Sequence, residues 1–280
     1  MLLAQTRRRL RQLGLQAKKS LGQHFLVDED ILKLIVSSAE LTSDDIVVEI
    51  GPGLGVLTEE LAKEAGLVIA VEIDKKLTAV LKERMASYQN IVVINEDILK
   101  VTPASLLEEV PAANAGTTDY KVVANLPYYI TSAVLRHFLE VESKPRIMVV
   151  MVQKDVAEAI VAEPGDMSML SISVQFYGQP KIVSYVPARS FHPAPAVDSA
   201  ILRIDRYPQP PVQIAEDQGF FNLVRAGFSA PRKQIANSLA QGLKWSKDEV
   251  SSLLEKAGIV TQRRAESLAL DEWARLWQVF

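Results

Sequence analysis

The chain has 280 residues, a formal net charge of −3 and no cysteine. Its length allows one large domain or two smaller ones. The absence of cysteine excludes disulfides, cysteine-ligated metals and a thiol nucleophile. No apolar run approaches 18 residues, so we expect no transmembrane helix and a cytoplasmic protein. The three histidines lack ligand spacing, so no metal site is expected.

The charge is unevenly distributed along the chain. Residues 1–27 contain six basic residues and no acidic one, and subtracting these six charges from the total leaves −9 for the remainder. Such an arm is a candidate for binding nucleic-acid phosphates. A solvated tail is the alternative, whereas a transit peptide is disfavoured because the arm runs directly into a structured motif. The phosphate-binding candidates in the arm are Arg7, Arg8, Arg9 and Arg11.

Apolar patterning predicts strands that alternate with helices from residue 27 onward. Helices are expected at 27–41, with Asp28 as the cap, and at 56–65, 75–87 and 132–140. Strands are expected at 45–50, 67–73, 91–94, 120–124 and 146–152. This alternation is typical of a parallel, doubly wound α/β sheet.

The pattern changes in the last hundred residues. Residues 179–204 alternate as β structure around a Pro-rich loop, and a Pro-rich linker follows at 207–212. From residue 213 the chain is expected to be helical. We therefore expect a basic arm (1–24), an α/β domain (25–207) completed by the late β-hairpin, and a small all-helical domain (213–280).

A glycine-rich segment, Gly51-Pro52-Gly53-Leu54-Gly55, lies between a predicted strand and a predicted helix. Glycines there allow the backbone to approach a ligand closely beside a helix N-terminus. The dinucleotide-binding pattern G-x-G-x-x-G would require glycine at position 56, which is Val56. An adenosyl cofactor without a pyrophosphate therefore fits better, and a simple tight turn is the alternative.

Three polar side chains each follow a successive predicted strand, namely Glu72, Asp97 and Asn125. Ligands of open α/β sheets bind at the carboxyl ends of the strands. A carboxylate at Glu72 can bind both hydroxyls of a ribose, and Asp97 could accept a hydrogen bond from the cofactor's adenine amine.

The quartet Asn125-Leu126-Pro127-Tyr128 suits a specific chemical problem. The exocyclic amine of adenine is a poor nucleophile because its lone pair is delocalised into the ring. The Asn125 side-chain oxygen and the Leu126 carbonyl could accept both amine hydrogens, and Tyr128 could stack on the base, which is worth about 1–3 kcal/mol. A Pro-containing turn after a strand is the alternative reading.

Together these features resemble the Rossmann-like S-adenosylmethionine-dependent methyltransferases. Three further segments resemble the rRNA adenine dimethyltransferases, from about residue 15 to the end of the chain, and most of all the family's small-subunit members. The segments are 18–26 (KKSLGQHFL), 190–199 (SFHPAPAVDS) and 228–239 (FSAPRKQIANSL), the last resembling a basic helix of the C-terminal domain.

The resemblance implies a function and roles for individual residues. The enzyme would use S-adenosyl-L-methionine to dimethylate N6 of two adjacent adenines, in a hairpin loop near the 3′ end of small-subunit rRNA within a pre-ribosomal 30S particle. It would act as a monomer, and domain 213–280 would help to dock RNA. The implied cofactor-pocket residues are His24, Leu26, Gly51, Gly53, Glu72, Asp97 and Asn125; the implied RNA contacts are Arg232 and Lys233; and the implied residues at the target base are Asn125, Leu126, Pro127, Tyr128 and, opposite Tyr128, Phe191.

Three other functions remain possible from the sequence. A large-subunit rRNA adenine methyltransferase that confers antibiotic resistance is disfavoured by the C-terminal basic segment. A non-enzymatic mitochondrial transcription factor of the same fold is disfavoured by the intact quartet. A nicotinamide-dependent oxidoreductase is disfavoured by Val56 and by the quartet.

Overall fold

The computed structural model describes residues 1–280 except 1, 15–16, 18–20, 109–118, 213 and 215–216. Lys18 and Lys19, two of the basic residues of the arm, therefore lie outside the described residues. The α-helices are α1 (Leu2–Gln12), α2 (Glu29–Ser38), α3 (Val56–Glu64), α4 (Lys75–Met85), α5 (Pro103–Glu108), α6 (Thr131–Leu139), α7 (Lys154–Ile160), α8 (Met169–Tyr177), α9 (Asp217–Gly227), α10 (Ile235–Leu243), α11 (Lys247–Lys256) and α12 (Leu270–Gln278). The strands are β1 (Phe25–Leu26), β2 (Ile46–Ile50), β3 (Leu67–Val71), β4 (Ile91–Ile94), β5 (Lys121–Asn125), β6 (Ile147–Gln153), β7 (Gly178–Val186), β8 (Phe191–His192) and β9 (Ser199–Arg206).

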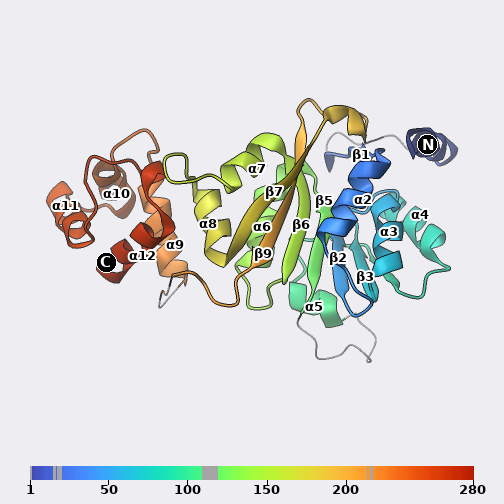
Figure 1. Ribbon diagram of the computed structural model, residues 1–280, viewed down its shortest axis with the longest axis horizontal. Helices are drawn as coiled ribbons and strands as arrows, with labels where there is room; N and C mark the ends of the chain where they lie inside the picture. The colour runs from blue at the N-terminus through green and yellow to red at the C-terminus, as the bar shows by residue number, and fades with distance from the viewer. Residues whose placement is uncertain (1, 15–16, 18–20, 109–118, 213, 215–216) are drawn as a thin grey trace. The chain divides into compact units, whose positions relative to one another are not determined.

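A seven-stranded sheet has the order β4-β3-β2-β5-β6-β9-β7 (Figure 1). The first five of these strands are parallel, and β9 pairs antiparallel with β6. From β2 the chain adds β3 and β4 on one side and later adds β5 and β6 on the other. The strand order therefore reverses between β2 and β5, which is where ligands of doubly wound sheets bind.

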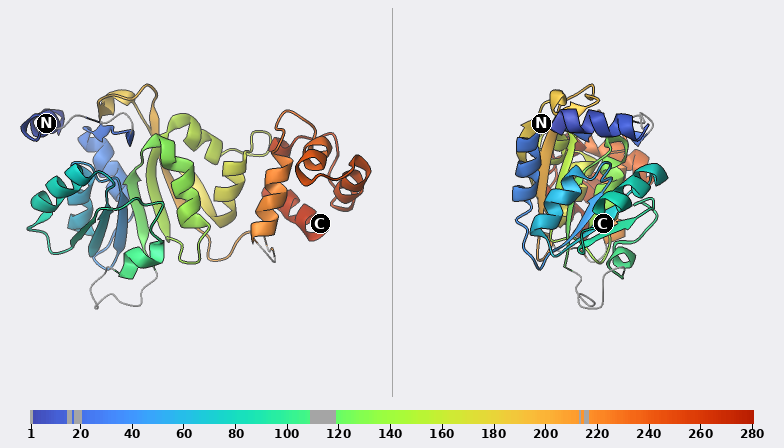
Figure 2. Two further views of the ribbon diagram at one scale, coloured as in Figure 1. Left: turned by 180° about the vertical axis from the view of Figure 1, so that it is seen from behind. Right: turned by 90° about the vertical axis from the view of Figure 1, so that its right-hand side faces the viewer.

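The parallel strands are short apolar runs covered on both faces. Every residue of β2 and β3 is buried, as expected for strands enclosed by helices. Helix α2 covers the face of the sheet that is turned toward the viewer in Figure 1. Helix α6 covers the opposite face, which the left view of Figure 2 shows from behind. The predicted doubly wound α/β sheet is confirmed by this arrangement.

Asp28 caps α2 as predicted, because its carboxylate accepts the N–H groups of Asp30 and Ile31. The same carboxylate accepts the Ser190 hydroxyl at 2.8 Å. A separate two-stranded pairing, β1 with β8, places Leu26 opposite Phe191. Residues 24–26 are thereby held against a segment that lies some 165 residues later in the chain.

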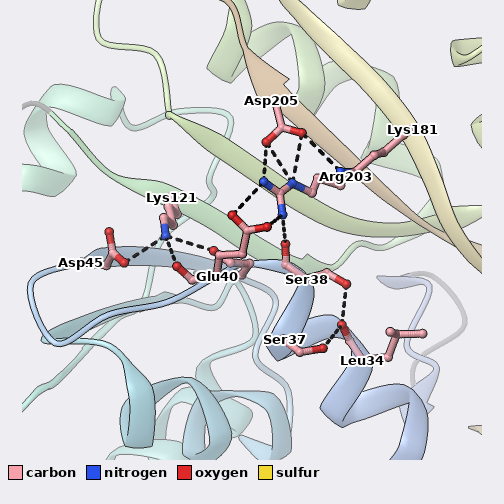
Figure 3. A network of polar contacts seen from close by, with 10 residues as sticks. Leu34, Ser37, Ser38, Glu40, Asp45, Lys121, Lys181, Arg203 and Asp205 are labelled. Carbon is pink, nitrogen blue, oxygen red and sulfur yellow. Dashed lines mark hydrogen bonds and ion pairs between the residues drawn. The ribbon is translucent and has the colours of Figure 1, made fainter.

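A network of charged residues lies at the amino ends of the central strands (Figure 3). The buried Lys121 ammonium donates to the carbonyls of Ala39 and Glu40 and to the Asp45 carboxylate, at 3.0, 2.6 and 2.9 Å. Arg203 binds the carboxylates of Glu40 and Asp205. Lys121 therefore has all three of its donors satisfied, which is what a buried ammonium requires.

The described chain divides into two compact units. The first comprises Met1–Ala157 and Lys181–Arg206 and contains most of the sheet, and the second comprises Glu158–Pro180 and Tyr207–Phe280. Segment 158–180, which the sequence places in the expected domain 25–207, thus groups with the helices of the second unit. No helix among the described residues is long and apolar enough to cross a membrane.

The second unit is built on an aromatic core. The Phe176 ring lies 5.4 Å from that of Phe220 and 5.3 Å from that of Phe221, in centroid distance. Helices α9 and α10 pack closely because residue 242 is glycine, where a Cβ would lie 2.6 Å from Ala226 Cα. A larger residue at Gly242 would force these two helices apart.

Candidate active site

A cavity of about 300 Å³ opens at the point where the strand order reverses. It has the size of a small-molecule site. Its walls come from residues 21–26 and from the segments that follow β2, β3, β4 and β5. Ten of the predicted site residues line it: His24, Leu26, Gly51, Gly53, Glu72, Asp97, Asn125, Leu126, Pro127 and Tyr128.

The glycine-rich turn after β2 requires glycine. Gly51 and Gly53 have φ values of 67° and 57°, in the left-handed region that other residues rarely adopt. A Cβ on Gly53 would also lie 3.1 Å from Phe25 Cε1. The turn therefore presents backbone without side chains to the cavity, which allows a ligand to approach it closely.

Glu72 is held in a fixed orientation at the end of β3. Its Oε2 accepts the Gly53 N–H at 3.1 Å, and its Oε1 accepts the Asp74 N–H at 2.9 Å. Burial raises the pKa of Glu72, although these two N–H groups favour the carboxylate. Carboxylate oxygens have further lone pairs, so Glu72 could also accept the two hydroxyls of a ribose.

Asn95 and Asp97 shape the end of β4. The Asn95 side chain donates to the Glu72 carbonyl at 2.7 Å, which joins the ends of β3 and β4. Asp97 Oδ1 accepts the Leu99 N–H at 3.1 Å, and Asp97 lines the cavity. The carboxylate is therefore held by its own turn, and it could accept a hydrogen bond from the amine of a nucleobase.

Glu49 lines the same cavity and was not predicted from the sequence. It is 1% exposed, and burial raises its pKa to about 8, with a further contribution from the charge of Glu72. Its Oε2 has no hydrogen-bond partner among the described residues. The available signal was a glutamate inside the apolar run IVVEI, two residues before Gly51.

The quartet is anchored by the arm segment that precedes β1. Asn125 Nδ2 donates to the His24 backbone carbonyl at 3.0 Å. The Tyr128 ring stacks on the His24 ring, with centroids 5.7 Å apart, and its hydroxyl lies 2.7 Å from Ser199 Oγ. His24 Nδ1 lies 2.7 Å from the Pro193 carbonyl. The Asn125 amide is thus oriented with its nitrogen toward His24 and its oxygen turned away.

Phe191 is placed differently from the other residues expected at the target base. It is 3% exposed, it belongs to the same hydrophobic core as Leu26 and Val186, and it is absent from the cavity lining. The ring that stacks on Tyr128 is that of His24. The role of Phe191 as the second face of a base clamp stays a prediction.

Two exposed hydrophobic side chains at the cavity were missed by the sequence analysis. Ile73 is partly exposed beside Glu72, and Tyr129 is 60% exposed beside Tyr128. Each directly follows a predicted site residue, and this adjacency was the available signal. Apolar surfaces of this kind can cover the flat face of a ring.

The arginines of the arm lie on a helix that was not predicted. Leu10 of α1 packs with Leu54 and Leu77, whereas Arg7, Arg8 and Arg11 are exposed and Arg9 is half-buried. The helix therefore has one apolar face and one basic face, and the recurrence of Leu2, Thr6 and Leu10 at intervals of four was its signal.

The expectation that Arg232 and Lys233 lie on a basic helix is wrong. Both residues are exposed but lie in a turn, and α10 begins only at Ile235. Gln234, the N-cap of α10, has a ψ of 149°, which is not helical and separates this turn from the helix. In the part of the chain that the structure describes, no group of three or more His, Asp or Glu side chains is placed to hold a metal ion.

Comparison with known proteins identifies the family. The family model for ribosomal RNA adenine dimethylase matches residues 14–280. The chain is 51% identical over 280 residues to a curated protein of Dehalococcoides mccartyi named ribosomal RNA small subunit methyltransferase A, a match that covers 100% of this chain and 94% of that protein. It is 42% identical over 276 residues to a protein of the same name from a Geobacillus species, covering 97% and 94%.

Two solved structures are similar along most of their length. The 23S rRNA methyltransferase ErmE aligns with a TM-score of 0.70 and 30% identity, covering 91% of this chain and 98% of that one. A dimethyladenosine transferase from Plasmodium falciparum aligns with a TM-score of 0.74 and 26% identity, covering 90% and 96%. The predicted Rossmann-like methyltransferase fold is confirmed, and the chain belongs to the ribosomal RNA adenine dimethylase family.

Proposed function

We propose that this protein uses S-adenosyl-L-methionine to dimethylate N6 of two adjacent adenines, in a hairpin loop near the 3′ end of small-subunit rRNA. The choice of the small subunit is supported by the names of the curated relatives, which match this chain at 40–51% identity over nearly its full length. The choice of an adenine amine is supported by the family and by the quartet at the end of β5.

The residues of the cavity fit S-adenosylmethionine, which supplies an activated methyl group on a sulfonium centre. Glu72 would bind the ribose hydroxyls, Asp97 would accept the adenine amine, and Ile73 would cover the adenine ring. The bare backbone at Gly51 and Gly53 would allow the ligand to lie against the turn. These four assignments are consistent with one nucleoside lying across the ends of β2, β3 and β4.

The orientation of the Asn125 amide is the observation that carries the proposed chemistry. Because Asn125 Nδ2 is bound to a carbonyl oxygen, Asn125 Oδ1 is the group left to accept an amine hydrogen. The Leu126 carbonyl would accept the second hydrogen, and Tyr128 would hold the ring. The target adenine must leave its stack to reach this position. Preorganised acceptors favour the geometry in which the amine nitrogen attacks the methyl carbon.

The remaining parts of the chain are assigned to RNA docking. The exposed arginines of α1 and the exposed pair Arg232 and Lys233 would contact phosphates, and the helical domain 213–280 would carry the latter pair. We propose that the substrate is a cytoplasmic pre-ribosomal 30S particle and that the enzyme acts as a monomer without a metal ion.

A large-subunit adenine methyltransferase is the second candidate, and the similarity to ErmE favours it. One experiment distinguishes the two. The protein is incubated with methyl-labelled S-adenosylmethionine and with separated small and large ribosomal subunits from cells that lack the modification. We expect label in the small-subunit RNA, at two neighbouring adenines. Label confined to the large subunit would support the second candidate, and label in neither would contradict both.

A further inference from the structure

Glu49 in β2 is a buried acidic residue for which the proposed chemistry has no role. It is 1% exposed, it lines the cavity, and its Oε2 has no hydrogen-bond partner among the described residues. A buried polar atom without a partner costs free energy. An apolar side chain would fill the same space without this cost, so the acidic group points to a ligand in the cavity.

The charge of the cavity wall indicates the kind of ligand. Among the described residues that line the cavity there is no lysine or arginine, whereas four side chains are acidic, namely those of Glu49, Glu72, Glu96 and Asp97. Opposite charges attract strongly where water is excluded. The wall therefore favours a ligand group that carries a positive charge.

Glu49 ionises readily only when a positive charge lies beside it. Burial, together with the charge of Glu72, raises its pKa to about 8, so the carboxyl group is mostly protonated at pH 7. An opposite charge within about 4–6 Å lowers the pKa of a carboxyl group by about 1–3. This coupling is reciprocal, so the ionised carboxylate binds the cation more tightly by the corresponding factor of about 10–1,000. Glu49 can therefore respond to the charge of a ligand.

The strand order shows which part of the cofactor would lie beside Glu49. Neighbouring strands follow the order β4-β3-β2-β5 across the sheet. In the proposed function, Asp97 after β4 binds the adenine, Glu72 after β3 binds the ribose, and Asn125 at the end of β5 binds the target amine. The sulfonium is bonded to the ribose carbon and directs the methyl group at the amine, so it would lie over β2. Glu49 is the acidic residue of β2 and stands one residue before the end of that strand.

We infer that Glu49 is a specificity-determining residue, which binds the positively charged sulfonium of S-adenosylmethionine and distinguishes it from the neutral thioether of S-adenosylhomocysteine. The identity of the cofactor rests on the proposed function. Methyl transfer removes the positive charge from sulfur, so Glu49 would favour the cofactor over the product and promote their exchange. Exchange is needed repeatedly, because each of two adenines receives two methyl groups.

The test measures binding, which does not require methyl transfer. The full-length protein is titrated with S-adenosylmethionine and, separately, with S-adenosylhomocysteine by isothermal calorimetry at pH 7.5. Glu49→Gln keeps the size of the side chain but cannot ionise. The preference for the cofactor, given by the ratio of the two dissociation constants, should fall by about 10-fold. This value is at the low end of the range because Glu49 must first lose its proton. Most of the change should come from weaker binding of S-adenosylmethionine.

Glu60→Gln is the matched control. Glu60 is a partly exposed residue of α3 that pairs with Lys63, so this variant removes one negative charge from the same unit at a position outside the cavity wall. It should keep the wild-type preference. A purely structural role of Glu49 would lower the melting temperature or weaken both ligands equally, and neither effect changes the preference.

A second measurement uses the wild type and does not depend on a folded variant. Calorimetry in two buffers of different ionisation enthalpy gives the number of protons released on binding. S-adenosylmethionine should release more protons than S-adenosylhomocysteine, by a fraction of one proton at pH 7.5, and this difference should vanish in Glu49→Gln. The comparison of the two ligands cancels contributions common to both from the other titratable side chains of the wall, which are His24, Glu72, Glu96, Asp97, Tyr128 and Tyr129.

The outcomes separate this inference from the proposed function. An unchanged preference in Glu49→Gln, or equal proton release for the two ligands in the wild type, would overturn the inference and leave the proposed function intact. A reduced preference in Glu49→Gln would support the inference even where the wild type labels no ribosomal particle and the proposed function fails. Failure of the wild type to bind S-adenosylmethionine would contradict both.

Discussion

The side-chain amide nitrogen of Asn125 donates to the backbone carbonyl of His24 at 3.0 Å, across 101 residues of sequence. A carbonyl can only accept, so this bond determines which end of the amide faces His24. Because the partner is a backbone atom, the orientation depends on where residues 24–26 are held and not on the His24 ring. The pairing of β1 with β8 holds them there, so the orientation of the Asn125 amide depends on the N-terminal segment and the Pro-rich loop together.

Glu72→Gln should weaken binding of S-adenosylmethionine. The amide keeps the shape of the carboxylate but loses its charge. One of the two acceptor oxygens is replaced by an NH2 group, which would face a backbone N–H that now donates to Glu72. Loss of charge-assisted hydrogen bonds should cost about 1.5–3 kcal/mol of binding free energy. Isothermal calorimetry measures this, with Glu60→Gln on the exposed face of α3 as the control. Equal affinities for Glu72→Gln and wild type would remove Glu72 from the cofactor site.

The basic face of α1 should contribute to RNA docking through its charge. Replacing the exposed residues Arg7, Arg8 and Arg11 by glutamine should weaken binding to the 30S particle. The slope of log K against log salt should fall by about 0.7–0.9 for each lost phosphate contact. Leu10 is kept so that the packing of the helix is preserved. A salt slope that stays at the wild-type value would show that the arm does not bind RNA.

Phe191→Ala should destabilise the protein. The side chain is buried in the core of the first unit, so its removal should cost about 3–5 kcal/mol of unfolding free energy. Urea denaturation measures the cost, and the methylation rate per folded molecule tests the expected clamp role separately. A variant with lowered stability and a normal rate would exclude Phe191 from the base-binding site.

The Lys121 network predicts a large effect on stability far from the cavity. Lys121→Met removes a buried ammonium from Asp45 and from two carbonyls, and it should cost about 3 kcal/mol. The cost lies at the low end for a broken buried pair because Arg146 still contacts Asp45 at 2.8 Å. The control Lys63→Met, in an exposed pair with Glu60, should change stability by at most about 1 kcal/mol. Equal unfolding free energies for the two variants would contradict this account.

The same network should weaken in acid. Burial opposes ionisation of Asp45, but hydrogen bonds from Lys121 and Thr42 prevail and lower its pKa, and the Arg203 hydrogen bond lowers the pKa of Glu40. A carboxyl whose pKa is lower in the folded state stabilises the fold above its unfolded pKa of about 4, and this contribution is lost as the pH falls further. Urea denaturation between pH 7 and pH 3 should show the loss, with a shallower decline for Asp45→Asn.

Much of the fold and the cavity could be predicted because the parallel strands are short apolar runs with polar residues at their carboxyl ends. Glu72, Asp97 and Asn125 could be placed together on that basis, and all three line the cavity. Helices α7 and α8 were missed, because α7 is only seven residues long and α8 buries six of its nine residues and so has no clear polar face.

The parts of the site that could not be predicted from the sequence are positioned by long-range contacts. Strands β1 and β8 have two residues each and therefore no periodicity. Their pairing sets the His24 carbonyl beside Asn125, stacks His24 on Tyr128 and buries Phe191. Each of these contacts joins segments more than 100 residues apart, so local patterns carry no information about them.

In the proposed reaction, Asn125 orients an adenine amine of small-subunit rRNA for methyl transfer. The most direct test is mass spectrometry of nuclease fragments of the rRNA from unmethylated small subunits, after incubation with S-adenosylmethionine and either the wild type or Asn125→Ala. The wild type should form N6,N6-dimethyladenosine at two neighbouring positions, and Asn125→Ala should be slower by a factor of about 100 or more while cofactor affinity is largely kept. Turnover by Asn125→Ala near the wild-type rate, or no dimethyladenosine with the wild type, would contradict the account.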